Sequence, residues 1–340
     1  MSELRRHAAQ LIARSGLGSL LELTPLPGGG NNQVYRANTT SGLYLLKSYF
    51  RHADDPRDRL GTEAAFAEFA WSHGLRQIAQ PLAFDSETGL GLHEFISGRT
   101  LRPDEVDAEA VDHAAEFFTA LNGRRNNAAA LRLPNASEAC FSLSDHLACV
   151  ERRIERLIEN TRSTPTDVLA AEFVERELTS AWRNSQSRVV EAADASGLAR
   201  DEPLAAADRC LSPSDFGFHN ALRDAAGRLR FIDFEYAGWD DPAKLVCDFF
   251  CQPAVPVPQR YFERFTERIA AVVRDAAAMR RRIDVLLPIY RLKWCCILMN
   301  DFLPDGGRRR NFARSDSEVA ERKSLQLGKA RMMLASVTTE

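Results

Sequence analysis

The stretch Leu211–Asp248 reads LSPSDFGFHNALRDAAGRLRFIDFEYAGWDDPAKLVCD and contains the three residues on which our interpretation of the fold depends. Asn220 lies five positions after Asp215, and Asp233 lies thirteen positions after Asn220. The run at residues 229–232 predicts a short strand that ends at Asp233, and the turn before it predicts a hairpin. A carboxylate, an amide and a second carboxylate therefore occur in a fixed order around one hairpin.

These three side chains match the requirements of phosphoryl transfer from ATP. One carboxylate must face the acceptor hydroxyl, while an amide oxygen and a second carboxylate hold Mg²⁺ on the phosphates. We therefore assign Asp215 as the catalytic base and Asn220 and Asp233 as the metal ligands. A lone aspartate in a loop is ordinarily a turn or cap residue, but the ordered spacing of all three is much rarer by chance.

The N-terminal part of the chain predicts strands at residues 21–26, 33–37 and 43–49, with a glycine-rich turn after the first. Glycine lets a backbone approach a phosphate closely because it has no Cβ. The third strand carries a lysine among apolar residues, and a buried charge needs a partner, which a glutamate in the helix expected over residues 58–73 supplies. Taken singly, the glycine turn also fits an ordinary hairpin turn, and the lysine and the glutamate also fit side chains that reach solvent. The nucleotide-binding residues predicted here are Gly28, Gly29, Gly30, Asn31, Lys47 and Glu63.

Two further apolar runs, at residues 81–84 and 91–95, complete an antiparallel five-stranded sheet with a helix. The segment HEFISG that follows predicts a linker whose backbone at Glu94 and Ile96 binds an adenine edge, although a plain edge strand is the alternative. We place a boundary at residue 97. Residues 1–97 then form a nucleotide-binding lobe, and residues 98–340 form a larger, mostly helical catalytic and substrate-binding lobe. Its helices are expected at residues 108–121, 143–158, 173–193, 259–273 and 283–302.

The composition is that of an ordinary globular protein, with 340 residues, 45% of them apolar and 27% charged. A formal net charge of −3 gives no reason to expect a nucleic-acid partner. No apolar run is long enough for a membrane span, and the N-terminus lacks the apolar core of a secretion signal. The seven cysteines are an odd number without a CxxC pair, which fits a reducing cytoplasm. We expect a cytoplasmic monomer or homodimer.

At these residues the chain resembles the aminoglycoside phosphotransferase and choline kinase-like family. The family signature is HGDxxxxN, then IDFE or IDWE, then GDPxxD. Here SPSDFGFHN and IDFEYAGWDDP stand in its place, and Asp248 lies where the last aspartate is expected. The resemblance runs from about Leu21 to Asp248. It implies a bilobal, protein-kinase-like α+β fold and a small-molecule kinase that uses ATP or GTP with Mg²⁺ to phosphorylate a small-molecule alcohol.

The catalytic loop departs from that signature. The family's histidine two residues before the catalytic aspartate is Pro213 here, and the glycine directly before the aspartate is Ser214. That histidine is thought to buttress the loop, so its absence puts the support of the loop in doubt without removing the base or a metal ligand. His219 is nearby, but by simple alignment it lies on the wrong side of Asp215 to replace it.

The acceptor is the least determined part of the prediction. An aminoglycoside needs several acidic side chains, whereas choline needs an aromatic cage. Tyr236, Trp239 and Trp294 could form such a cage or simply pack in a core, and Glu235 is a further residue expected beside the acceptor. A sugar or an amino alcohol stays equally open. The alternative function, supported by Pro213, is a nucleotide-binding pseudokinase or scaffold. A protein kinase is disfavoured because no long activation loop follows Asp233.

Overall fold

A computed structural model describes residues 2–27, 32–52, 55, 57–159, 162–303 and 316–338 of the chain. It contains two compact units, each drawn from three separate stretches of sequence. Unit 1 comprises Met1–Ala139, Cys210–Asp240 and Val257–Val272, and unit 2 comprises Cys140–Arg209, Asp241–Pro256 and Val273–Glu340. A lobe boundary at residue 97 stays a prediction.

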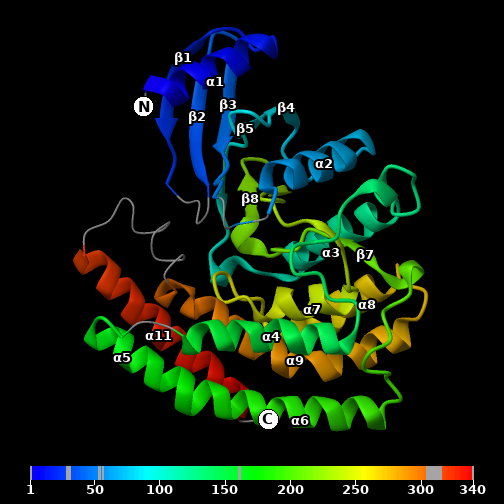
Figure 1. The fold of residues 1–340 in the computed structure, drawn as a ribbon. Helices are drawn as coiled ribbons and strands as arrows, with labels where there is room; N and C mark the ends of the chain where they lie inside the picture. The colour runs from blue at the N-terminus through cyan, green and yellow to red at the C-terminus, as the bar shows by residue number, and fades with distance from the viewer. Residues whose placement is uncertain are drawn as a thin grey trace. The chain divides into compact units, whose positions relative to one another are not determined.

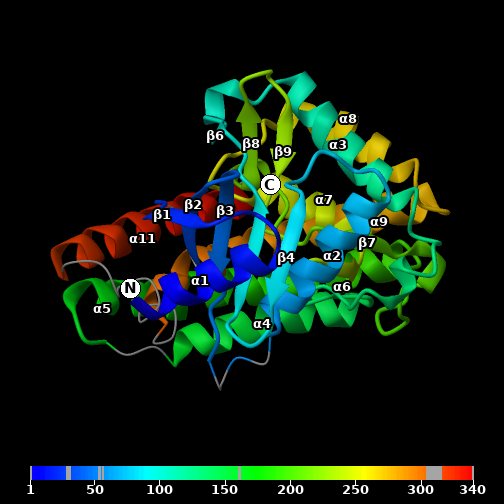
Figure 2. The same cartoon turned by 90° about the horizontal axis from the view of Figure 1, so that it is seen from above.

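Unit 1 contains the expected antiparallel five-stranded sheet, with the strand order β1-β2-β3-β5-β4. Helix α1 (Ser2–Arg14) packs on one face of this sheet, where its residues Ala8, Leu11 and Ile12 share an apolar core with Leu46 and Leu92 (Figures 1 and 2). The five strands are β1 (Leu20–Pro25), β2 (Gln33–Thr39), β3 (Gly42–Ser48), β4 (Pro81–Asp85) and β5 (Leu90–Glu94).

Helix α2 (Arg59–Ser72) supplies the partner of the strand lysine. It begins at Asp58, whose carboxylate accepts a hydrogen bond of 2.9 Å from the backbone N–H of Gly61. Its residues Phe66 and Ala70 are buried, and the helix packs against β4 and β5. Because side chains alternate along a strand, Lys47 points to the face opposite the α1 core, and α2 meets it there.

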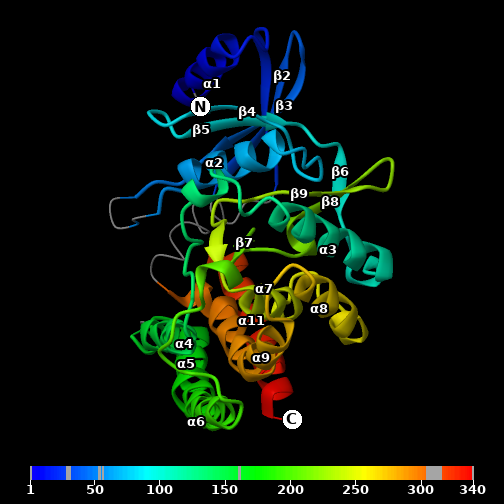
Figure 3. The same ribbon diagram turned by 90° about the vertical axis from the view of Figure 1, so that its right-hand side faces the viewer.

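A second, three-stranded antiparallel sheet follows the linker and was predicted only in part. The hairpin of β8 (Ala221–Asp224) and β9 (Leu229–Phe231) was expected, but β6 (Gly98–Thr100) was not. Figure 3 shows β6 beside β8. Gly98 permits this pairing, since a Cβ there would lie 2.8 Å from the carbonyl oxygen of Arg223. A short pair, β7 (Cys210–Ser212) and β10 (Gly238–Asp240), lies on either side of the loop that contains Asp215 and of the hairpin.

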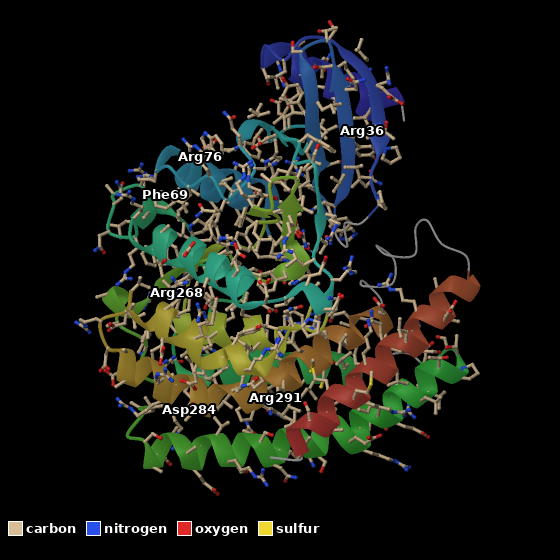
Figure 4. The ribbon with its side chains drawn as sticks, turned by 180° about the vertical axis from the view of Figure 1, so that it is seen from behind. Arg36, Phe69, Arg76, Arg268, Asp284 and Arg291 are labelled. Atoms are coloured by element: carbon tan, nitrogen blue, oxygen red, sulfur yellow. The ribbon has the colours of Figure 1, made fainter. Side chains whose placement is uncertain are left out.

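Two helices complete unit 1. Helix α3 (Ala108–Asn122) lies against α8 (Phe262–Ala270), and Asp112 of α3 forms ion pairs with Arg264 at 2.5 Å and Arg268 at 2.9 Å (Figure 4 labels Arg268). On its other side, Phe117 of α3 stacks on Phe231 at the end of β9, with ring centroids 4.9 Å apart. Helix α3 therefore supports the strand that leads to Asp233.

Unit 2 is helical and centres on α9 (Ala276–Leu298), which packs against α4, α6, α7 and α11; Figure 4 labels Asp284 and Arg291 on it. Pro288 lies inside α9. The last helix was not among those predicted. A π-helical turn at Phe173–Leu178 joins the second and third helices of this unit. The helices around α9 are α4 (Leu143–Ile158), α5 (Pro165–Glu172), α6 (Thr179–Ala195), α7 (Pro242–Cys251) and α11 (Asp316–Thr338).

Two buried carboxylates hold α7 to its neighbours in unit 2. Asp241 caps α7 through the N–H of Ala243 at 2.7 Å and also accepts from Arg282 Nε at 2.9 Å and His146 Nε2 at 3.1 Å. Burial alone would raise the pKa of Asp241, but Arg282 and His146 overcome it and lower this pKa to about 2. These groups form the Asp241 cluster.

Asp248, the last residue of the signature, has equally complete partners. Its carboxylate accepts from Lys293 Nζ at 2.8 Å and from Trp294 Nε1 at 2.8 Å, both on α9. Trp294 therefore points its polar edge at an aspartate of its own unit. Within the residues described, no helix has both the length and the hydropathy of a bilayer-spanning segment.

Candidate functional site

The loop between β7 and β8 holds Asp215 by short-range bonds. Ser214 adopts a left-handed backbone with φ +67°, which explains why the family signature has glycine there. Its N–H donates to Ser212 Oγ at 3.0 Å, and Asn220 Nδ2 donates to the carbonyl oxygen of Asp215 at 2.9 Å. The side chain of Asp215 is 38% exposed. The loop is thus braced without a histidine at the position of Pro213.

Alternate residues of the loop face the core. Phe216 and Phe218 are buried, and the ring of Phe216 lies 5.1 Å from that of Phe231. A single 3₁₀ turn at Phe218–Asn220 then reverses the chain. It brings His219 to Asp215, with Nε2 of the imidazole 3.0 Å from Oδ1 of the carboxylate. Alignment alone missed this contact, because it depends on the turn.

The β8–β9 hairpin brings the two predicted metal ligands close together. The N–H of Ile232 donates to the carbonyl oxygen of Asn220 at 2.9 Å, and Asp233 is the next residue after Ile232. Asp233 has φ +68°, a conformation rare for a side-chain-bearing residue and frequent at functional sites. Since the amide nitrogen of Asn220 is engaged with Asp215, its oxygen is the atom suited to a cation.

This pair fits Mg²⁺ in particular. Among the described residues there is no group of three or more His, Cys, Asp or Glu side chains that could hold a metal ion. Mg²⁺ does not need such a cage, because it is commonly bound by one or two carboxylates together with substrate phosphates and water. One amide oxygen and one carboxylate on a strand end are sufficient protein ligands for that mode of binding.

Lys47 joins the sheet, α2 and the metal-ligand strand. Its Nζ lies 2.6 Å from Glu63 Oε2 and also forms an ion pair with Asp233 Oδ1. Glu63 in turn accepts from Tyr49 OH at 2.9 Å and from the N–H of Phe234 at 3.3 Å. The structure therefore brings together three predicted residues from segments far apart in sequence. We name Lys47, Glu63, Asp233 and Glu235 the Lys47 cluster.

Negative charge is in excess in the Lys47 cluster. Burial alone would lower the pKa of Lys47, but Asp233 and Glu63 overcome it and raise this pKa above its usual value. Burial raises the pKa of Asp233 to about 6; Lys47 opposes this, and the carboxylates of Glu235 and Glu63 reinforce it. One ammonium thus contacts two carboxylates, and the nearby carboxylate of Glu235 also acts on the pKa values of Lys47 and Asp233.

Glu235, a residue expected beside the acceptor, is buried in the Lys47 cluster. It is 2% exposed, and its carboxylate accepts a hydrogen bond from Asn32 Nδ2. The guanidinium of the buried Arg59 lies 3.8 Å from it. Glu235 therefore ties the strand end at Asp233 to the residue that follows the glycine turn. The turn itself, Gly28, Gly29, Gly30 and Asn31, lies outside the described residues.

The linker residue Glu94 has hydrogen-bond partners outside the Lys47 cluster. The carboxylate of Glu94 accepts from the N–H of Gln80 at 3.0 Å and from Arg230 Nη2 at 2.6 Å. In the part of the chain that the structure describes, the backbone of Ile96 makes no hydrogen bond.

The face of the sheet that carries Lys47 has apolar residues beside the lysine. Val34 lies opposite Lys47 in the strand pairing. Leu45, on the same face, lies between His93 and Arg36 of the neighbouring strands. Sequence analysis had not identified Val34 and Leu45, although the alternation around Lys47 indicates them.

The family model of the phosphotransferase enzyme family matches residues 22–282. The chain belongs to this family. The resemblance inferred from the signature is therefore confirmed, and as a member of the phosphotransferase family the protein is a small-molecule kinase. No curated protein matches the chain significantly.

Solved structures show which fold this family member has. A choline/ethanolamine kinase family protein from Mesorhizobium loti is similar with a TM-score of 0.62 and 19% identity, over 98% of this chain and 99% of that one. A choline kinase from Streptococcus pneumoniae gives 0.60 and 18%, over 98% and 99%. A spectinomycin phosphotransferase in complex with ADP and spectinomycin gives 0.63 and 12%, over 96% and 98%. The fold is thus the expected protein-kinase-like α+β fold.

Proposed function

We propose that this phosphotransferase transfers the terminal phosphoryl group of ATP, with Mg²⁺, to a hydroxyl group of a small-molecule alcohol. The observation that carries the proposal is the Lys47 cluster. A buried lysine bridges a helix glutamate and the aspartate at the end of β9, and Asn220 lies across the hairpin from that aspartate. This is the arrangement that phosphoryl transfer requires of a kinase-like site.

Each residue then has a distinct task. Lys47 binds the α- and β-phosphates, and Glu63 holds the ammonium in place. Asn220 and Asp233 hold Mg²⁺, which neutralises charge on the phosphates when bound. Asp215 orients the acceptor hydroxyl and accepts its proton. No covalent enzyme intermediate is needed, so positioning and charge stabilisation provide most of the acceleration.

The purine is proposed to bind along the linker. The backbone groups of Ile96, which have no partner among the described residues, suit the edge of a base, whereas Glu94 contributes through its backbone because Arg230 and Gln80 hold its carboxylate. Val34 and Leu45 are half-buried on the same face as Lys47 and offer apolar surface to the ring. The glycine turn is proposed to cover the phosphates. ATP or GTP satisfies these contacts.

The proposed acceptor is defined by its hydroxyl group and includes amino alcohols, aminoglycosides and sugars. Tyr236, one of the three rings that could form an aromatic cage or pack in a core, already has the guanidinium groups of Arg57 and Arg59 5.8 Å from its ring. The indole of Trp239 donates to the carbonyl oxygen of Ala130 at 3.0 Å. These contacts favour packing roles for both rings. All seven cysteines are reduced thiols and buried, which supports the proposed cytoplasmic location.

The proposal is tested by measuring the release of ADP from Mg-ATP, or of GDP from Mg-GTP, over choline, ethanolamine, spectinomycin, other aminoglycosides, sugars and homoserine. We expect one class to stimulate release and to give a phosphorylated product by ³¹P NMR. Asp215→Ala is the matched control, expected to bind nucleotide normally and to lower transfer by orders of magnitude to a residual, measurable rate. Nucleotide binding without transfer to any acceptor would instead support a pseudokinase or scaffold, the alternative suggested by Pro213.

A further inference from the structure

His219 is in contact with the carboxylate of the proposed base. Its Nε2 lies 3.0 Å from Asp215 Oδ1, and the two side chains are 19% and 38% exposed, respectively. Because an ionised carboxylate only accepts hydrogen bonds, the imidazole is the donor in this contact. His219 therefore donates a hydrogen bond to the Asp215 carboxylate, the group proposed to accept the proton of the acceptor hydroxyl.

The shape of the loop explains how two consecutive residues reach Asp215. Phe218, His219 and Asn220 form a 3₁₀ turn in which Phe218 is buried. Within this turn, His219 and Asn220 both come back to Asp215. Asn220 Nδ2 binds the carbonyl oxygen of Asp215, whereas His219 binds its side chain. The main chain and the carboxylate of one residue are thus held by separate neighbours.

The imidazole makes no other hydrogen bond within the described residues. Its Nδ1 is buried and lacks a partner there. An unpaired buried nitrogen costs free energy, so a role in a wider polar network does not explain the residue. Any effect of the His219 ring on activity through hydrogen bonding therefore acts through Asp215.

We propose that His219 is a positioning residue for phosphoryl transfer, which fixes the orientation of the Asp215 carboxylate toward the acceptor. This inference rests on the proposed function. It assigns to the end of the loop the support that the family's histidine gives at its start, where this chain has Pro213. Without this donor the carboxylate would meet the hydroxyl in the productive geometry less often, which lowers kcat without weakening nucleotide binding.

The test compares His219→Leu, which removes the donor, with His219→Gln, whose amide can still donate. Both are measured with Mg-ATP and whichever of choline, ethanolamine or spectinomycin gives the fastest ADP release. We expect His219→Leu to lower kcat on the order of 10-fold to 100-fold. The KM for ATP should stay unchanged, and His219→Gln should recover most of the loss.

A double-mutant cycle separates positioning from a structural role. If His219 acts through Asp215, then His219→Leu has no further effect in an Asp215→Ala background. An equal loss of kcat in both backgrounds, or an unchanged kcat in His219→Leu alone, overturns the inference. A lower melting temperature with equal losses would identify a purely structural residue.

A measurement that does not depend on turnover separates this inference from the proposed function. In the ¹⁵N-labelled protein, the Nε2 proton of His219 should be shifted downfield by the carboxylate and should lose that shift in Asp215→Ala. An active enzyme without this signal overturns the positioning role alone. A protein that shows the signal but transfers phosphate to no acceptor overturns the proposed function, and the positioning role of His219 in transfer with it.

Discussion

The Lys47 cluster of unit 1 and the Asp241 cluster of unit 2 are both buried groups of charges, but they are balanced differently. In the Asp241 cluster one carboxylate has an arginine, a histidine and a backbone N–H, and its pKa is lowered to about 2. In the Lys47 cluster one ammonium serves several carboxylates, and the pKa of Asp233 is raised to about 6. The first arrangement is complete by itself, whereas the second has negative charge available for a cation.

This difference in charge balance accords with a structural role for the Asp241 cluster and with the proposed functional role of the Lys47 cluster. A buried carboxylate with matched donors stabilises the fold and gains nothing from a ligand. A cluster with excess carboxylate is stabilised when a cation binds to it. The protein therefore gains part of its stability only when the ligand is bound. Replacing single residues in each cluster should therefore affect different properties.

The largest expected effect is on catalysis, from Asp233→Asn. The substitution removes a proposed metal ligand, so we expect transfer to fall by at least about 10³-fold. Stability should change little, because Lys47 keeps Glu63 and a like-charged neighbour is lost. ADP release and urea denaturation measure the two effects. A variant that transfers normally would contradict the assigned role.

The second effect is on stability, from Asp241→Asn. This change leaves the buried guanidinium of Arg282 without its carboxylate, and we expect a loss of about 3 to 5 kcal/mol in the free energy of unfolding. Urea denaturation monitored by circular dichroism gives this value. A loss similar to that of Asp233→Asn would remove the distinction between the two clusters.

The third effect is a pH dependence that arises beside the Lys47 cluster. Burial lowers the pKa of His93 from 6.5 to about 4. Between these values only the unfolded chain binds the proton, so stability is lost as the pH falls from about 6.5 to 4, by up to about 3 kcal/mol. His93→Leu should lose this dependence. Denaturation of both proteins at pH 7, 5.5 and 4.5 measures it, and parallel curves would count against it.

The smallest effect concerns the backbone before the base. Ser214 is held at φ +67°, so Ser214→Gly should relieve strain and stabilise the protein by about 1 kcal/mol. The matched control is Gly227→Ser, at φ +81° with no atom within 4 Å of an added Cβ, which should cost a similar amount. Thermal denaturation compares the two. Destabilisation by Ser214→Gly would show that the hydroxyl group matters more than the strain.

Sequence analysis predicted those parts of the fold that depend on local pattern. Alternation and glycine turns gave the five strands of the first sheet, and helical spacing gave α2 and α4 with their observed bounds or nearly so. β6 was missed because three residues pair with a strand far along the chain, and no local pattern specifies such a partner. Helix α11 was missed although Leu327, Ala330 and Leu334 follow helical spacing and are buried.

In the candidate site, too, local spacing predicted some contacts, whereas contacts that depend on a turn or on distant residues were not predicted. The spacing of Asp215, Asn220 and Asp233 is linear information, and the hairpin places the last two as expected. The contact between His219 and Asp215 depends on a 3₁₀ turn, and the burial of Glu235 depends on Asn32 and Arg59 from another part of the chain. Spacing thus predicts which residues meet around one hairpin, but not which distant side chains complete the environment.

The discontinuous unit 1 also constrains how the protein is made. Its last stretch ends at Val272, and the helices of Cys140–Arg209 are synthesised before that stretch leaves the ribosome. The lysine of the first sheet therefore lacks Asp233 until the first stretch of unit 2 has been translated. A nascent chain released before residue 272 would expose an unfinished apolar surface to chaperones and proteases, so translational pausing upstream of α8 should be harmful to the yield of this kinase.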